Sequence, residues 1–554
     1  MTARETLSVA DMIAAGLAGM GVKVVFGVIS IHNMPILDAI ARQGKIRFVS
    51  ARGEAGAFNM ADAYARVSRH LGVVITSTGT AAGNAAGASV EALSACSPIL
   101  HITSTVDRKF ADRDRAAIHD VPRQPDMLKA ISKAYFRMWD GASAVGTLKA
   151  AIRTAMSAPA GPVALEIPVD VQRDPCAPML SFGPPTIARV TPTPEHLDRL
   201  AEMLAKSKRP MLWLGGGARG AGEAAQALAA RGVGVVTSTN GRGIVPEAHG
   251  GTLGAFNMTP EAAQIYASSD LMLVVGSRLR GNETRNNDMA LPRPLIQVDA
   301  DASQSCRNYA VDFFAHGDAG LVLEGIVSRL PKSWKADPQL AYDIAVARAK
   351  SEGALRQTLG PYQVIADALL QRVPAGRHPW VRDVTISNST FGNRYVQIAA
   401  PHLGVHALGG GIGQGIPMAI GAALACETAK TVCLVGDGGA MLSLGELITA
   451  VEEKANVVFV LMNDKAYGVI QNIQDAQYAG RRHYSTPLSP EFGMLAASIG
   501  IAHRRLSKVE QFAEAFDASL TVAGPILLEV DMIAIGPFAQ AFGGPPAGAA
   551  GGAR

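Results

Sequence analysis

Two short polar stretches in the last third of the chain carry residue types that could bind a metal ion and an anion. The first, Gly436-Asp437-Gly438-Gly439-Ala440, directly follows the apolar run from 431 to 435. The second, Asn463-Asp464, follows the apolar run from 457 to 462. Carboxylate oxygens suit a hard cation such as Mg²⁺, and glycines let backbone amides at a helix start approach an anion closely.

The elements that must position these residues are two neighbouring parallel strands. Between Gly438 and Asn463 lie 24 residues, enough for one helix and a returning strand. The carboxyl ends of the two strands then meet at one sheet edge, where doubly wound sheets bind ligands. We therefore expect Asp437 and Asp464 to share a metal ion. A polar strand end without a ligand is the alternative, because isolated Gly-Asp-Gly turns are common.

This pattern resembles the thiamin-diphosphate motif, in which Gly-Asp-Gly is followed at a similar distance by Asn-Asn. The resemblance implies that Asp437, Asp464 and the backbone carbonyl of Ala466 bind magnesium. It also implies a set of cofactor contacts from Gly436, Asp437, Gly438, Gly439, Ala440, Asp464, Tyr467 and Gly468. One departure is that Asp464 stands where the family has its second asparagine. The added negative charge is expected to hold the metal more tightly.

A glutamate in the N-terminal part of the chain has a candidate catalytic role. Glu54 lies between a predicted strand at 46–50 and a predicted helix at 55–66, in the run ARGEAGAFNMADAYAR. An acidic residue favoured by a helix N-terminus is the simpler explanation. In the family that the sequence resembles, however, the matching glutamate faces the aminopyrimidine ring and favours its imino tautomer. Apolar neighbours such as Ala55 and Phe58 are expected to raise the pKa of Glu54 by desolvation.

A glycine-rich stretch from 407 to 425 (ALGGGIGQGIPMAIGAALA) precedes a small-residue helix. In the family the matching stretch bends the cofactor. The resemblance implies that the side chain of Ile412 wedges between the cofactor's rings and that the carbonyl of Gly410 accepts a hydrogen bond from its exocyclic amine. Family members build each site from two subunits, and Glu54 and Ile412 fall in different units of this chain. A homodimer or homotetramer with shared sites is therefore expected.

The substrate side of the site departs from acetolactate synthases. His32, six residues after Phe26, coincides with a histidine that benzaldehyde lyase uses for proton transfer, and it is the first acid-base candidate. His119 is a second candidate, although a shift of one residue would exchange it with Asp120. The further residues expected to line the substrate pocket are Ser30, Thr80, Asn84, Asp120 and Ile470.

The resemblance implies a carbon–carbon lyase or carboligase that acts on a small-molecule 2-oxo acid or 2-hydroxy ketone, by decarboxylation or by acyloin formation or cleavage. Two alternatives stay open: a flavin-containing oxidase of the pyruvate oxidase type, and a catalytically silent relative. The run from 211 to 214, followed by Gly215, Gly216 and Gly217, only partly matches a dinucleotide fingerprint. Because the segment from 276 to 284 also departs from the flavin-binding pattern, FAD is not expected.

Short apolar runs alternate with helical patterns along the whole chain, which predicts an α/β fold with doubly wound parallel sheets. The expected units are a pyrimidine-binding domain at 1–174, a central Rossmann-like domain at 190–332 and a diphosphate-binding domain at 360–540. A proline-rich linker at 173–195 is expected to join no sheet or helix interior, because prolines lack amide donors. A charged helical linker is expected at 331–361, and the Gly/Ala/Pro-rich tail at 541–554 is expected to be flexible.

Composition excludes several function classes. The 554 residues carry a net charge of only +4 and scattered basic residues, so nucleic acid is not an expected partner. No apolar run approaches the roughly 18 to 20 residues of a membrane span. Five cysteines, an odd number without metal-ligand spacing, argue against a disulfide framework and favour the cytoplasm.

Overall fold

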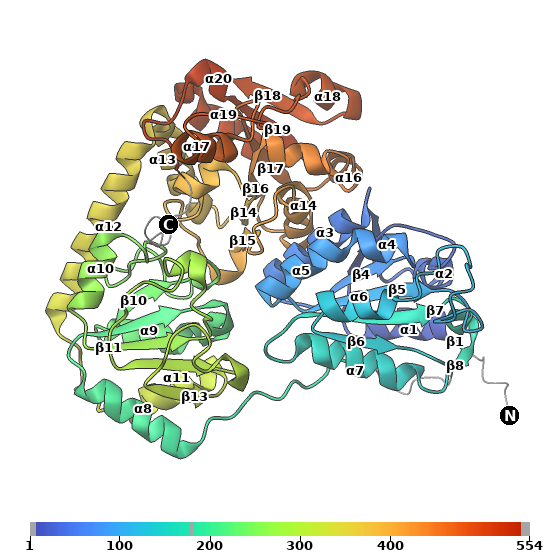
Figure 1. The fold of residues 1–554 in the computed structure, drawn as a ribbon, viewed down its shortest axis with the longest axis horizontal. Coiled ribbons are helices and arrows are strands. Elements are labelled where there is room, and N and C mark those ends of the chain that lie inside the picture. Colours follow the sequence, from blue (N-terminus) through green and yellow to red (C-terminus); the bar gives the residue numbers. More distant parts are fainter. Residues whose placement is uncertain (1–6, 177–181, 544–554) are drawn as a thin grey trace.

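The computed structural model describes residues 7–176 and 182–543, which form three α/β domains, each built on its own parallel sheet (Figure 1). The N-terminal domain is blue to teal, the central domain green to yellow, and the C-terminal domain orange to red. The expected class, three doubly wound parallel-sheet domains, is confirmed. Residues 544–554, most of the expected flexible tail, lie outside the described residues.

The N-terminal sheet has the strand order β3-β2-β4-β5-β7-β6, and all its pairs are parallel. Its strands are β2 (Val24–Gly27), β3 (Arg47–Ser50), β4 (Gly72–Thr76), β5 (Ile99–Thr105), β6 (Ala134–Arg137) and β7 (Pro162–Pro168). Its helices are α1 (Val9–Gly19), α2 (Met34–Gln43), α3 (Glu54–Ser68), α4 (Thr80–Asn84), α5 (Ala86–Ala95), α6 (Gln124–Ile131) and α7 (Ala144–Met156). Strands β4, β5 and β7 are buried along their whole length, as expected for strands covered by helices on both faces.

The central sheet has the order β10-β9-β11-β12-β13. Its strands are β9 (Pro210–Leu214), β10 (Gly234–Thr237), β11 (Leu271–Val275), β12 (Leu295–Asp299) and β13 (Phe313–His316). Its helices are α8 (Pro194–Lys206), α9 (Gly222–Ala230), α10 (Pro260–Ala267) and α11 (Ala319–Arg329). The ligand-binding edge of such a sheet lies where the strand order reverses, here between β9 and β11.

The C-terminal sheet, β15-β14-β16-β17-β19-β18, repeats the strand order of the N-terminal sheet. Its strands are β14 (Trp380–Arg382), β15 (Gly404–His406), β16 (Thr431–Gly436), β17 (Val457–Asn463), β18 (Ala502–Leu506) and β19 (Ile526–Asp531). Its helices are α13 (Gln363–Ala375), α14 (Gly415–Ala425), α15 (Asp437–Ala440), α16 (Glu446–Glu452), α17 (Gly468–Gln477), α18 (Phe492–Ile499), α19 (Phe512–Thr521) and α20 (Met532–Ile535). The order reverses between β14 and β16, which makes the ends of these two strands the expected ligand edge.

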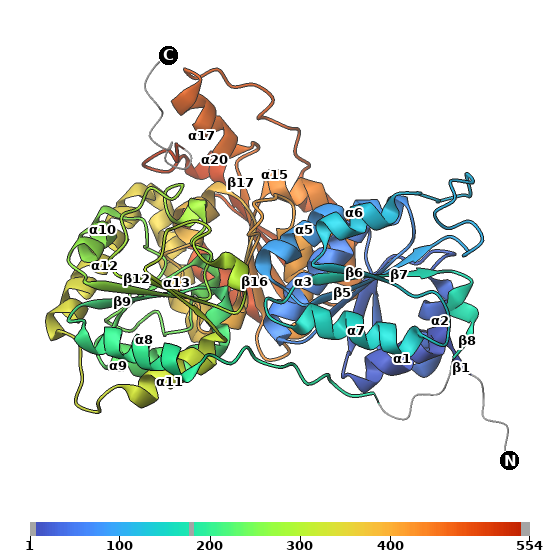
Figure 2. The ribbon, with the colours of Figure 1, turned by 60° about the horizontal axis from the view of Figure 1, so that its bottom comes forward.

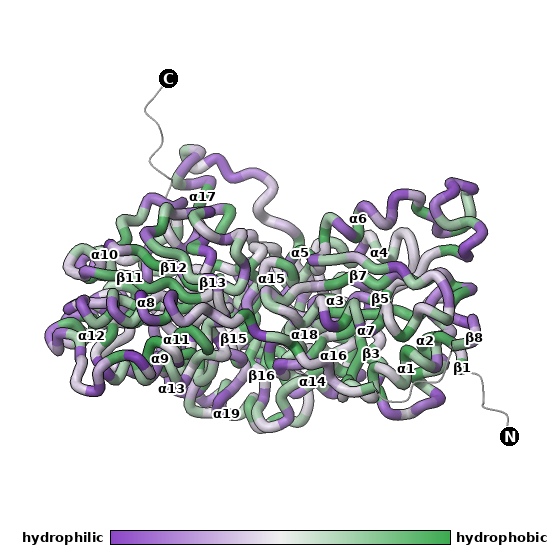
Figure 3. Tube along the Cα trace, turned by 90° about the horizontal axis from the view of Figure 1, so that it is seen from below, coloured by the Kyte–Doolittle hydropathy of each residue, from purple (hydrophilic) through white to green (hydrophobic). Residues whose placement is uncertain are grey.

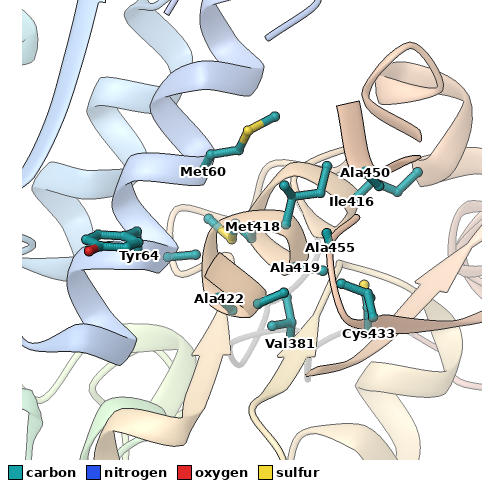
Figure 4. Packing of buried hydrophobic residues seen from close by; sticks show 14 of the residues in the cluster. Met60, Tyr64, Val381, Ile416, Met418, Ala419, Ala422, Cys433, Ala450 and Ala455 are labelled. Carbon is teal, nitrogen blue, oxygen red and sulfur yellow. The ribbon is translucent and has the colours of Figure 1, made fainter. Parts of the chain in front are cut away.

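The N- and C-terminal domains pack through helices α3 and α14. Met60 and Tyr64 on α3 and Met418 and Ala422 on α14 are all buried in one apolar cluster (Figure 4). A Cβ added at Gly421 would lie 2.0 Å from the backbone oxygen of Met60, so only glycine permits this approach. Colouring the chain by hydropathy separates apolar from polar segments: the strands are mostly green and many outer loops are purple (Figure 3).

The first expected linker differs in part from the prediction, whereas the second is helical as expected. The expectation that the proline-rich stretch joins no sheet was wrong, because β8 (Pro175–Cys176) pairs antiparallel with β1 (Leu7–Ser8). Proline is tolerated there because β8 is a two-residue edge strand. Likewise Pro194 begins helix α8, where a missing amide costs nothing.

The second linker forms α12 (Pro338–Thr358), the long yellow helix at the left edge of Figure 1. Leu340, Ile344 and Ala347 of this helix are buried in an apolar cluster of the central domain. The helix therefore packs on the central domain (Figure 2). Within residues 7–176 and 182–543, no helix is both long and apolar enough to cross a membrane.

Candidate active site

Asp437 and Asp464 lie at the carboxyl ends of the neighbouring strands β16 and β17. These strands pair in parallel, with Gly436 opposite Met462. Helix α15 begins at Asp437 itself, so the glycine turn is also the first turn of a helix. The amides that begin α15 follow directly on the end of β16, and amides at a helix start favour an anion.

The oxygen atoms at this edge fit a hard divalent cation. Asp437 is 1% exposed; its Oδ2 accepts a hydrogen bond from Ser489 (2.7 Å), whereas its buried Oδ1 has no partner within the described residues. Burial, and then the neighbouring Asp437, raises the pKa of Asp464 to about 7. A Cβ at Gly438 would lie 3.4 Å from the carbonyl oxygen of Ala466, so this carbonyl also borders the turn. Two close carboxylates and a carbonyl form a ligand set that suits magnesium.

A cavity of about 470 Å³ opens beside these oxygens. Its lining residues are Val384, Thr385, Ile386, Ile412, Gly436, Asp437, Gly438, Gly439, Leu442, Asp464, Ala466, Tyr467, Gly468, Val469 and Ile470. Of the residues expected to hold the cofactor, the cavity brings together all except Gly410 and Ala440. Ala440 is buried beneath the turn, and Gly410 stands at a φ of +82° with no atom near a Cβ position.

The glycine loop, residues 408–414, carries Gly410 and Ile412 past the cavity. Ile412 is 40% exposed. The end of the loop is fixed by Asp383, whose Oδ2 accepts the amides of Gly413 (3.1 Å) and Gly415 (3.2 Å). Burial raises the pKa of Asp383 to about 6, while these amide bonds lower it. Asp383 was not predicted, although its place directly after β14, beside β16 at the switch point, is a signal that could have identified it.

Glu54 begins helix α3, where the helix N-terminus favours its charge. Its Oε2 accepts a hydrogen bond from Asn84 at the end of α4 (3.1 Å). Phe58 is buried, but Ala55 is exposed and Glu54 itself is partly exposed. A single chain therefore does not supply the full apolar surroundings expected for Glu54. Nor does Glu54 line the cavity, whose described lining comes from the C-terminal domain alone.

The two candidate histidines meet at the carboxyl end of the N-terminal sheet. The rings of His32 and His119 lie edge to face with centroids 5.1 Å apart. His32 is buried (7% exposed), and Ser77 Oγ lies 3.5 Å from its Nδ1. Burial, and then His119, lowers the pKa of His32, whereas Asp107 raises it. The backbone amide of His32 donates to Ser30 Oγ (3.2 Å), so the predicted residue Ser30 helps to hold this loop.

The loop of His119 rests on the turn before α4, which begins at Thr80. Gly79, at a φ of +64°, packs so closely that an added Cβ would lie 2.5 Å from the His119 carbonyl oxygen. Gln124 holds this turn by accepting the amide of Gly79 (2.6 Å), a role that the sequence did not reveal. Asp120 follows His119; its Oδ2 is buried without a hydrogen-bond partner within the described residues, and burial raises the pKa of Asp120.

A second cavity, of about 250 Å³, lies at the switch point of the central sheet. It is lined by Gly216 and Gly217 after β9, Gly276 after β11, and Arg278 and Arg280 beyond it. These are the segments that only partly matched a dinucleotide fingerprint.

Comparisons with known proteins agree with this arrangement. Family models of thiamine pyrophosphate enzymes match in three places: the N-terminal TPP binding domain at residues 7–127, the central domain at 197–326 and the C-terminal TPP binding domain at 386–530. A protein of Pseudomonas aeruginosa named probable 2-ketoarginine decarboxylase is 30% identical over 542 residues, covering 96% of this chain and 95% of that relative.

Acetolactate synthases are more distant relatives. The large subunit of isozyme 3 from Escherichia coli is 27% identical over 535 residues, covering 90% of this chain and 89% of the relative. Among solved structures, a thiamin diphosphate-dependent enzyme isolated from Mycobacterium smegmatis has a TM-score of 0.80 and 23% identity, covering 95% of this chain and 99% of that one. At that identity the likeness bears on the fold.

Proposed function

The chain belongs to the thiamine pyrophosphate enzyme family, and we propose that it is a magnesium- and thiamin-diphosphate-dependent lyase or carboligase acting on a 2-oxo acid or a 2-hydroxy ketone. The observation that carries the proposal is the cavity bordered by Asp437, Asp464, Ala466 and the glycine turn. The buried, unpartnered Oδ1 of Asp437 marks where a cation would compensate charge.

Each group of residues has a separate task in this proposal. When bound, thiamin diphosphate would supply nucleophilic chemistry toward the substrate carbonyl. Asp437, Asp464 and the Ala466 carbonyl hold the metal, and the amides that begin α15 hold the diphosphate. Glu54 of a second subunit holds a proton at the aminopyrimidine. His32, assisted by His119, moves a proton to or from the reacting oxygen or carbon.

We further propose that the active form is at least a homodimer. In the single chain the cavity lining comes from the C-terminal domain, while Glu54 and the histidine pair lie on the N-terminal domain. Exposed apolar side chains surround both parts: Ile29, Ile31 and Ile118 on one, Leu442, Ile470 and Leu488 on the other. Exposed apolar surface of this kind is typical of interaction sites.

Mixing two inactive variants tests the shared site. Glu54→Gln and Asp437→Asn each remove one half of the site, so in a mixed dimer one of the two sites is intact. Unfolding and refolding the variants together should restore activity that neither variant shows alone. If the refolded mixture stays inactive while refolded wild type recovers, each site belongs to one chain.

The substrate is best sought among 2-oxo acids with a cationic end. One relative is named for 2-ketoarginine. In the loop that carries His119, the buried Oδ2 of Asp120 has no hydrogen-bond partner within the described residues, which suits a cationic substrate end. A panel of cationic, aliphatic and aromatic 2-oxo acids, assayed for carbon dioxide release with and without thiamin diphosphate and Mg²⁺, tests the proposal. Silence across the whole panel would favour a catalytically silent relative.

We propose that no flavin takes part, because the segment from 276 to 284 departs from the flavin-binding pattern. The absorption spectrum of the purified protein tests this point. A yellow protein that reduces oxygen during turnover would instead favour the oxidase alternative.

A further inference from the structure

A buried carboxylate of the N-terminal domain holds the beginning of the glycine loop. Glu91, on helix α5, is 1% exposed. Its Oε1 accepts the amide of Leu408 and its Oε2 accepts the amide of Gly409, both at 2.6 Å. A Cβ added at Gly409 would lie 2.8 Å from Glu91 Oε2, so the fit between the loop and the carboxylate is close.

Arg66 fixes the position of Glu91. This guanidinium, on helix α3, donates to Glu91 Oε1 (3.1 Å), to both oxygens of Asp62 and to the carbonyl of His406 (2.7 Å). Burial alone would lower the pKa of Arg66, but the carboxylates of Asp62 and Glu91 raise it. The group is therefore a charged, hydrogen-bonded network and not a neutral packing contact.

The glycine loop is thus held by a buried carboxylate at each end. At its beginning, Glu91 binds two amides, and Arg280 of the central domain donates to the carbonyl of Leu408 (2.5 Å). At its end, Asp383 binds the amides of Gly413 and Gly415. The residues between the two ends, Gly410 to Ile412, are those assigned to the cofactor.

We propose that Glu91 is a positioning residue that holds the glycine loop, before the cofactor binds, in the conformation that the cofactor requires. This inference rests on the proposed thiamin diphosphate site. Without Glu91 the loop must be ordered when the cofactor binds, and the cost of ordering it then lowers the affinity.

Glu91→Gln tests the proposal with little change in shape. One carbonyl oxygen remains, but the new amide group presents a donor to a backbone N–H. The expected result is that the Kd for thiamin diphosphate in the presence of Mg²⁺, measured by calorimetry, rises about tenfold to a hundredfold. Deuterium uptake at residues 408–412 of the cofactor-free protein should rise, while saturating cofactor restores most of kcat.

Glu247→Gln is a matched control. Glu247 is equally a buried carboxylate, is paired with Arg242 (2.7 Å), and accepts an amide of another domain, that of Ile398 (2.7 Å), but does not touch the glycine loop. It should lower the Tm without changing the Kd. Glu91→Asp, which keeps the charge but is too short to reach both amides, should weaken cofactor binding as Glu91→Gln does.

Wild-type Kd in both Glu91 variants, or an equal loss of affinity in Glu247→Gln, would overturn the role of Glu91. Failure of the wild-type protein to bind thiamin diphosphate would instead contradict the proposed function. Deuterium exchange at residues 408–412 of the cofactor-free protein separates the two results, because it reports on the loop independently of the cofactor.

Discussion

The imidazole rings of His32 and His119 lie edge to face, with centroids 5.1 Å apart and an angle of 84° between their planes. They come from loops that follow β2 and β5, which are separated by β4 in the sheet. One ring is buried and the other exposed. Burial lowers the pKa of His32, which favours the neutral ring that can act as a base.

His32→Asn removes the buried base and is expected to lower kcat/KM by about 10²- to 10⁴-fold, the usual contribution of a positioned proton-transfer group. The Kd for thiamin diphosphate should not change, because the residues proposed to hold the metal, the diphosphate and the aminopyrimidine do not include His32. Steady-state kinetics and calorimetry measure the two effects. His70→Asn, at an exposed histidine of the same domain, is the control, and an active His32→Asn would remove His32 from the mechanism.

His119→Asn is expected to move the acid limb of the kcat/KM profile to higher pH. Burial and then His119 lower the pKa of His32 below 6.5, so the neutral base persists to lower pH in the wild-type protein. Removing the charge of His119 raises that pKa again. Asp107→Asn should move the same limb to lower pH, because Asp107 raises the pKa of His32. If the acid limb moves in the same direction in His119→Asn and Asp107→Asn, or moves in neither, His32 does not set the pH profile.

The sequence alone was enough to predict the parallel sheets and the edge of the site at which Asp437 and Asp464 lie. Continuous apolar runs such as those of β16 and β17 indicate buried parallel strands, and the spacing from Gly438 to Asn463 places their ends together. Side chains that act across the domains left no comparable pattern. Glu91 and Leu408 are 317 positions apart, and only the packing of α3 on α14 brings their segments together.

The error at the first linker has a physical cause. Proline predicts the end of regular structure, yet Pro175 lies in an edge strand and Pro194 at a helix start, where no amide hydrogen bond is lost. The many charged residues of α12 made its three buried positions, Leu340, Ile344 and Ala347, hard to identify from the sequence. These residues are buried against the central domain.

Glu54→Gln is expected to leave the Kd for thiamin diphosphate nearly unchanged and to slow exchange of the cofactor's C2 proton by orders of magnitude. An amide keeps the shape but cannot hold a proton as a carboxyl group does. Quenched-flow exchange followed by NMR measures the rate. Glu195→Gln, at an exposed first-turn glutamate of α8, is the matched control. Full turnover in Glu54→Gln would contradict the assignment.

Asp464→Asn restores the residue usual in the family motif and should act in opposite directions on the two forms of the protein. Without metal it removes a carboxylate beside Asp437, so the Tm should rise by roughly 2 °C. With Mg²⁺ it removes a charged ligand, so the metal should bind about tenfold more weakly. Thermal unfolding with EDTA and with a Mg²⁺ series measures both. A Tm that falls in EDTA would show that the two carboxylates do not repel each other.

Acid should destabilise the protein partly through His101, a fully buried histidine of β5. Burial lowers its pKa from 6.5 to about 4, and its Nε2 lies 2.9 Å from Thr76 Oγ1. Between these two values the unfolded chain binds a proton that the folded chain does not. Stability is therefore complete above pH 6.5 and falls toward pH 4, by about 1.4 kcal/mol per pH unit for this group alone.

His101→Gln keeps a polar contact to Thr76 but cannot titrate, so its Tm should fall less between pH 7 and pH 5 than that of the wild-type protein. The change of shape can lower the Tm at every pH, and only the difference in slope reports on the proton. His70→Gln, at an exposed position with no such burial, should leave the slope unchanged. Equal slopes for wild type and His101→Gln would mean that other groups, such as carboxylates in ion pairs, cause the loss of stability in acid.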